Sequence, residues 1–180
     1  LVWPLVWMTA LLLAGAWPGA AKAGAPGPLR LQADAPSLDA WPHVQVLVDG
    51  PQADTATAAQ MLHRLGSFAP PTGPAANLGS QDGVVWLHLQ LQVPAGAARP
   101  WVLDIDNPAL DRVDLSVFHE GRLRQRAAMG DTLAPAERAL PTRTLATALD
   151  LPPGQVVDLL LRVQSTGTLM LPLLLMQPDA

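Results

Sequence analysis

The sequence contains no cysteine among its 180 residues. It can therefore form no disulfide, and it offers neither a thiolate nucleophile nor a Cys-ligated zinc or iron–sulfur site. An excess of basic residues is also missing, because 11 Lys and Arg stand against 15 Asp and Glu and give a formal net charge of -4. Nucleic-acid binders carry a basic surface, so we expect no nucleic-acid partner.

Short motifs for catalysis and metal binding are absent as well. The four histidines are too far apart in the sequence for an H-x-x-x-H metal pair. Neither the G-x-S-x-G turn of a serine hydrolase nor a Gly-rich phosphate loop occurs. Residues 104–114 are dense in carboxylates but lack the EF-hand's glycine and terminal glutamate, which favours a structural turn. We expect no metal, no cofactor and no catalytic residue, although the paired carboxylates of a glycoside hydrolase would meet only in space and stay an alternative.

The first 21 residues carry no charge. Their dense apolar stretch, 8–17, has the length of a signal-peptide h-region, and the triplet 21–23 fits an A-x-A cleavage pattern. The sequence therefore predicts a signal peptide over residues 1–23 and export of the chain. An uncleaved membrane anchor is the alternative, because a run of this length could span a bilayer, but Pro4 and Pro18 weaken such a helix.

The next part of the chain changes character several times. Residues 24–43 are rich in Pro, Ala and Gly, which predicts an extended lead-in. A short strand is expected over 44–48. Capping residues followed by apolar residues at helical spacing predict one short helix over 58–65. Three Pro and three Gly within 67–83 predict a long loop.

Beyond Gly83 the apolar residues recur with a period of two, which is typical of half-buried strands. The runs are separated by turns rich in Pro and Gly, and this pattern favours an antiparallel sandwich. The predicted fold class is all-β: a jelly-roll-like antiparallel β-sandwich with one short helix, spanning 44–176. The expected strands are 84–93, 101–106, 112–118 with an extension over 122–126, 142–151, 156–164 and an apolar run over 168–175.

The same alternation predicts which side chains face away from the core. An aromatic ring, carboxylates, an amide and a guanidinium on one sheet face would suit a sugar, whose C–H side packs on the ring while its hydroxyls bond the polar groups. A solvated outer face is the alternative interpretation. Trp86 is then either covered by the loop 67–83 or available to a ligand. The candidate ligand-binding residues are Trp86, His88, Asp104, Asp114, Asp158 and Arg162.

Blocks of sequence in a fixed order also resemble a known family. From residue 44 to about 176 the chain is similar to the extracellular type 2 domain of bacterial seven-transmembrane receptors with diverse intracellular signalling modules (7TMR-DISM). The most specific blocks lie in the second half of the chain. The resemblance rests on LVDGP, NLGSQDGVVWLHLQL, WVLDIDNPALDRVDL, GDTLAP, the arginine of ALPTR, LPPGQ and LLLRVQSTGTLMLPLLL.

This resemblance implies a periplasmic jelly roll joined to a seven-helix membrane unit and a cytoplasmic output module, expected after residue 180. His88 and Ser116 depart from the family pattern, which usually has an arginine and an aromatic residue there. Besides Trp86 and Arg162, the family-characteristic positions are Gly130, Asp131, Arg143 and Ser165, whose role is either ligand contact or the locking of loops through charge-assisted hydrogen bonds.

The combined prediction is a non-catalytic, periplasmic sensing domain that binds a small, carbohydrate-like ligand. Ligand-biased packing of the last strand, 168–176, would transmit the signal to the membrane. Two other classes remain as alternatives: a free-standing secreted carbohydrate-binding module, and a domain whose sheet face binds a partner protein.

Overall fold

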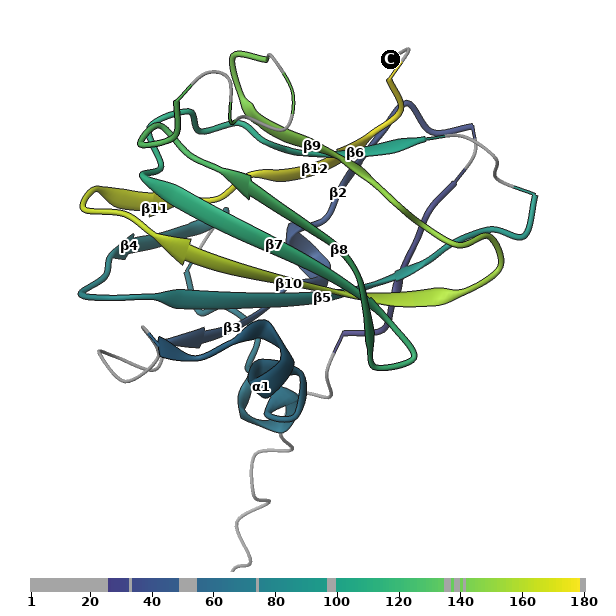
Figure 1. Ribbon diagram of the computed structural model, residues 1–180, viewed down its shortest axis with the longest axis horizontal. Coiled ribbons are helices and arrows are strands. Elements are labelled where there is room, and N and C mark those ends of the chain that lie inside the picture. Colours follow the sequence, from purple (N-terminus) through teal and green to yellow (C-terminus); the bar gives the residue numbers. More distant parts are fainter. Residues whose placement is uncertain are drawn as a thin grey trace, which may run out of the picture.

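The computed structural model describes residues 26–32, 34–48, 55–73, 75–96, 100–134, 137, 140 and 142–178. The expected signal peptide, 1–23, lies outside these residues. Among the residues that are described, no helix is long and apolar enough to cross a bilayer. Described strands make up two facing β-sheets and a small third one (Figure 1).

The larger sheet is built around four long antiparallel strands in the order β5, β10, β7, β8. Two short strands share the free edge of β5: β3 pairs antiparallel with its first half, and β1 pairs parallel with its last residues. The bounds are β1 (Leu29–Arg30), β3 (Gln45–Val48), β5 (Val85–Gln92), β7 (Arg112–His119), β8 (Arg122–Met129) and β10 (Val156–Gln164).

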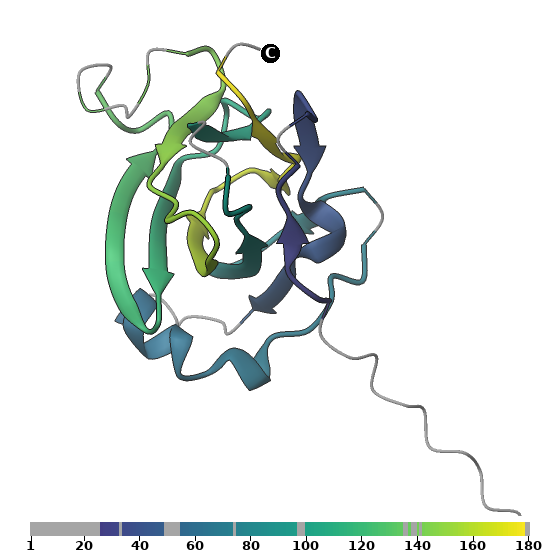
Figure 2. The same cartoon turned by 90° about the vertical axis from the view of Figure 1, so that its right-hand side faces the viewer.

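The second sheet has the order β2, β12, β6, β9, and a two-stranded sheet pairs β11 with β4. Seen from the side, the strands curve around a common interior (Figure 2). These strands are β2 (Ser37–Asp39), β4 (Asn77–Ser80), β6 (Trp101–Ile105), β9 (Leu145–Leu149), β11 (Thr168–Met170) and β12 (Leu173–Met176).

The main core lies between the two large sheets. Successive side chains of a strand point to opposite faces, so every second residue of a strand enters the core. On β10 these are Val157, Leu159, Leu161 and Val163, all fully buried, as the alternation predicts. Burial of this apolar surface is the main driving force for the fold.

A second apolar cluster covers the outer face of the larger sheet. Its helix, α1 (Ala58–Leu62), begins with a capping box in which Thr57 and Gln60 satisfy each other's backbone amides. Met61, from α1, is fully buried against the sheet. We call this group the outer cluster; its buried members are Met61, Phe68, Val84, Trp86, Phe118 and Leu160.

The antiparallel sandwich, with one α-helix among the residues that the structure describes, confirms the expected fold class. The strand expected over 156–164 has those bounds in the structure, and the extension over 122–126 is the separate hairpin strand β8. The helix is shorter than expected and ends at Leu62, followed by a 3₁₀ turn over Leu65–Ser67.

Three expectations about element boundaries need correction. The lead-in contributes strands β1 and β2, whose residues pair with β5 and β12. The expected loop 67–83 contains β4, which pairs with β11. The run 168–175 is divided between two sheets at Leu171 and Pro172, because proline has no amide hydrogen with which to continue a ladder.

Candidate functional site

Trp86 faces away from the main core, as the alternation predicts, but it is not available as a sugar platform. Its side chain is buried, with only 2% of the residue exposed, and it packs with Met61, Phe68 and Leu160 of the outer cluster. Helix α1 and the chain after it therefore cover the ring. Trp86 is covered and not available, but the expected cover, the loop 67–83, contributes only Phe68 to the cluster, and α1 contributes more residues than this loop does.

His88 and Asp158 form a polar contact within the same outer face. The His88 Nε2 lies 2.9 Å from the Asp158 Oδ1, and the Gln90 side-chain amide donates to the same oxygen at 2.9 Å. The ring of Phe68 packs edge-on against His88, with 5.9 Å between ring centroids. Because His88 is 5% exposed, it supports the packing under Phe68 and offers little surface to a ligand.

The environment of Asp158 acts on its carboxyl group in two directions. Burial is the strongest single influence and raises the pKa, because it penalises the charged form. Hydrogen bonds from His88 and Gln90, and the electrostatic attraction of His88, lower it and prevail, so the pKa of Asp158 lies below its ordinary value. Asp158 is thus an ionised carboxylate at neutral pH.

Asp104 does not belong to this face, and its assignment to it is wrong. It lies on β6 in the other sheet, where it pairs with Ala146 and Leu174, and it is 4% exposed. Its carboxylate accepts a hydrogen bond from the Thr144 hydroxyl. Alternation places a side chain relative to its own strand only, so it could not reveal that β6 joins a different sheet from β5 and β10.

Trp86, Asp114 and Arg162 do come together, in the wall of a pocket beside α1. This outer-face pocket has a volume of about 440 Å³. Arg162 and Asp114 are register partners on β10 and β7, and their side chains approach to 3.6 Å. The remaining lining residues include Ala56, Thr57, Ala58, Ser116, Arg126, Ala127 and Ala128.

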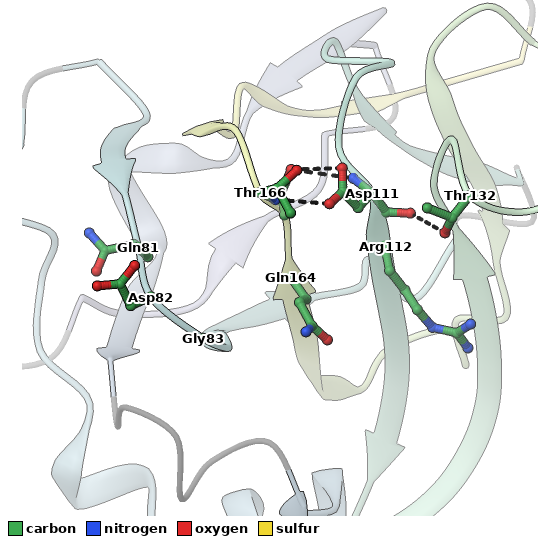
Figure 3. A pocket seen from close by; sticks show the side chains of 9 residues that line it. Gln81, Asp82, Gly83, Asp111, Arg112, Thr132, Gln164 and Thr166 are labelled. Atoms are coloured by element: carbon green, nitrogen blue, oxygen red, sulfur yellow. Dashed lines mark hydrogen bonds between the residues drawn. The ribbon is translucent and has the colours of Figure 1, made fainter.

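A second pocket lies where β5 and β7 begin and β8 and β10 end (Figure 3). Its volume is about 550 Å³. Loop residues, the first residue of β7 and the last residue of β10 contribute polar side chains to it, and we name it the Asp111 pocket. It is lined by Gln81, Asp82, Gly83, Asp111, Arg112, Thr132, Gln164, Ser165 and Thr166.

Asp111 organises this pocket through hydrogen bonds of its side chain and of its backbone. Its Oδ2 accepts a hydrogen bond from the Thr166 backbone amide at 2.8 Å, and its Oδ1 accepts one from the Ser165 hydroxyl at 3.2 Å. Its carbonyl oxygen accepts from the Thr132 hydroxyl at 2.6 Å, and its amide donates to the Ser165 Oγ at 3.4 Å. Figure 3 shows Asp111 between Thr166 and Thr132. The bond from Thr166 is the largest reason that the pKa of Asp111 lies below its ordinary value.

Of the family-characteristic residues, Gly130 and Asp131 follow β8 and contact the segment just before β7. Gly130 has a φ of +144°, and a Cβ there would overlap the carbonyl oxygen of Asp111, so only glycine fits. The Asp131 amide donates to the Leu110 carbonyl oxygen at 2.9 Å. Arg143 is exposed, and within the described ranges it has no side-chain hydrogen bond or ion pair. Ser165 is the one of the four that also lines the pocket.

The pattern of residues did not single out Asp111. It lies in a carboxylate-rich turn, and its two main partners are more than 50 residues away in the sequence. No local spacing signals such a contact. Across the residues that the structure places, no group of three or more His, Cys, Asp or Glu could hold a metal ion.

Comparison with known proteins gives one family match. Residues 42–177 match the model of the family described as 7TMR-DISM extracellular 2. Among solved structures, TmCBM61 in complex with β-1,4-galactotriose is similar at 12% sequence identity and a TM-score of 0.34. The alignment covers 78% of this chain and 86% of that one. No curated protein matches the chain.

Proposed function

The chain belongs to the 7TMR-DISM extracellular 2 family, the extracellular part of seven-transmembrane receptors, and we propose that it is a non-catalytic input domain. Its ligand in this proposal is small, hydroxyl-rich and carbohydrate-like, and it binds in the Asp111 pocket. In this proposal the domain works in the periplasm, and a seven-helix membrane unit with a cytoplasmic output module receives its signal.

The observation that carries the proposal is the convergence of polar side chains at one end of the sandwich. Carboxylates, amides, hydroxyls and a guanidinium supply both donors and acceptors, which is what a ligand rich in hydroxyl groups requires. Loops on a rigid scaffold are the usual place for binding residues. Asp111 holds Ser165 and Thr166 in position, so a ligand would meet groups that are already ordered.

The path from this pocket to the last strand supports a signalling role. Ser165 and Thr166 line the pocket, and β11 begins two residues later, at Thr168. The chain then passes through Pro172 into β12, which pairs with β6 and β2. A ligand can shift this segment only if it binds one arrangement of the loop more tightly than another. We propose that contact with residues 164–166 provides that difference.

The test is a titration of the purified chain with a panel of neutral sugars while its thermal midpoint is measured. A ligand that binds the folded state raises the midpoint by linkage. We expect at least one saturable shift, and we expect Asp82→Ala to weaken it by about tenfold, the cost of one hydrogen bond to a charged group. Asp82 is exposed and lines the pocket.

Asp106→Ala is the matched control. Asp106 is also an exposed aspartate next to a strand end, but it does not line the Asp111 pocket, so this variant should bind like the wild type. Equal binding by both variants would show that the ligand does not bind in this pocket. A silent panel with a folded chain would reject the sugar ligand and favour the alternative in which the domain binds a partner protein.

A further inference from the structure

We infer that the outer-face pocket is a second binding site, which takes a small organic anion: a carboxylate attached to a compact apolar body. This site lies on the covered face of the larger sheet beside α1 and shares no lining residue with the Asp111 pocket. The inference is argued separately from the sugar proposal, because the two pockets have different lining residues; Arg112 alone enters both arguments.

Two guanidinium groups line this pocket, those of Arg126 on β8 and Arg162 on β10. Arg126 is exposed, and no residue in the described part of the chain forms a hydrogen bond or ion pair with its side chain. Arg162 is more enclosed, with 18% of its side chain exposed. A partly enclosed guanidinium is a strong recognition group for a carboxylate, because its N–H groups match the two carboxylate oxygens.

Asp114 is the one acidic residue in the lining, and Arg112 neutralises it. The Arg112 Nε lies 3.0 and 3.1 Å from the two Asp114 oxygens, and Nη2 lies 2.8 Å from Oδ1. Arg162 approaches the same carboxylate at 3.6 Å, so Asp114 also helps to hold Arg162 in place. Arg126 lines the same pocket, so three arginines stand in or beside it against the single carboxylate of Asp114, which leaves a local positive charge in a chain whose net charge is -4. Such a surplus attracts anions.

The other walls of the pocket are mainly apolar. Ala56 and Ala58 flank the start of α1, Ala127 and Ala128 belong to β8, and Trp86, which is almost fully buried, lies in the wall between them. The Thr57 hydroxyl is already engaged in the capping box with Gln60. Small apolar walls next to two cations favour a ligand that combines an anionic group with an apolar body over a ligand covered in hydroxyl groups.

The test uses benzoate as the anionic probe and benzamide as its neutral counterpart of similar shape. Binding is followed by calorimetry and by the indole N–H signal of Trp86 in NMR spectra. We expect saturable binding of benzoate that weakens with added salt, and much weaker binding of benzamide. Arg126→Gln should weaken benzoate binding about tenfold, the value of one charge-assisted hydrogen bond, while Arg126→Lys should retain part of it.

Arg124→Gln is the matched control, since Arg124 lies on the same strand but pairs with Asp150 and does not line the pocket. It should bind benzoate like the wild type. Absence of saturable benzoate binding, equal binding by Arg126→Gln, or equal binding of benzamide would each overturn the inference. Glucuronate serves as a hydroxyl-covered carboxylate: tighter binding of glucuronate than of benzoate would overturn the assignment of an apolar body.

Discussion

The Ser165 hydroxyl donates a hydrogen bond to the Asp111 Oδ1 at 3.2 Å, although the two residues are 54 positions apart in the sequence. The contact joins the start of β7 to the loop after β10. The amide of Thr166 binds the other carboxylate oxygen at 2.8 Å. Asp111 therefore ties the loop after β10 to the segment just before β7, at the polar pocket in Figure 3.

Ser165→Ala should loosen this junction without unfolding the domain. It removes one donor to Asp111 and one acceptor for the Asp111 amide, so the free energy of unfolding should fall by about 1 kcal/mol. Chemical denaturation measures this loss, and faster hydrogen exchange at the Thr166 amide should accompany it. Ser37→Ala, at an exposed position on β2, should change neither quantity. Unchanged exchange at Thr166 in the Ser165 variant would show that Asp111 does not depend on Ser165.

Gly130→Ala should be strongly destabilising. The φ of +144° is unfavourable for any residue with a Cβ, and the added carbon would overlap the Asp111 carbonyl group. Backbone strain of this kind costs about 1–3 kcal/mol, and the overlap adds to it. Gly66→Ala is the control, because nothing lies within 4 Å of the added Cβ there. Equal thermal midpoints for the two variants would contradict the positive φ and the close packing of Gly130 in the β8–β9 loop.

Asp158 should make stability depend on acid pH. Its pKa is lower in the folded state than the ordinary value of about 3.9. A depressed pKa stabilises the folded state above the unfolded-state value, and this stabilisation is lost as the pH falls through the folded-state value. The wild type should therefore lose more unfolding free energy than Asp158→Asn between about pH 5 and pH 2. Denaturation curves at several pH values measure the difference.

The exposed Asp106 supplies the comparison for that series. Asp106→Asn should lose stability in acid to the same extent as the wild type. If Asp158→Asn also follows the wild-type curve, the contacts of Asp158 with His88 and Gln90 contribute nothing to the acid dependence.

Leu160→Ala tests whether α1 covers the outer face. Leu160 is fully buried in the outer cluster, whereas Leu123, on the edge strand β8, is 42% exposed. Truncation of a buried leucine costs about 2–5 kcal/mol, and truncation of the exposed one should stay within about 0.5 kcal/mol. Urea denaturation of both variants measures the contrast. Similar small losses would mean that α1 does not pack on the sheet in solution.

The strands themselves follow from the sequence alone. Alternation of apolar and polar residues is a local property that needs no knowledge of the partner strand, and β10 has the predicted bounds of 156–164. The same local rule placed Val157, Leu159 and Leu161 in the core, where they are fully buried. The resemblance to the family likewise rested on the order of short sequence blocks, and the match over residues 42–177 confirms it.

Only the tertiary structure decided which strands are neighbours and what covers their outer faces. Asp104 and Asp114 occupy similar places in their own strands, yet β6 and β7 belong to different sheets. Trp86 is buried because α1 and Phe68 pack over it, and Asp111 has its role because residues 165 and 166 come next to it in space. The physical reason is the same each time: periodicity fixes the direction of a side chain from its own backbone, whereas burial and hydrogen bonding depend on segments that are distant in the sequence.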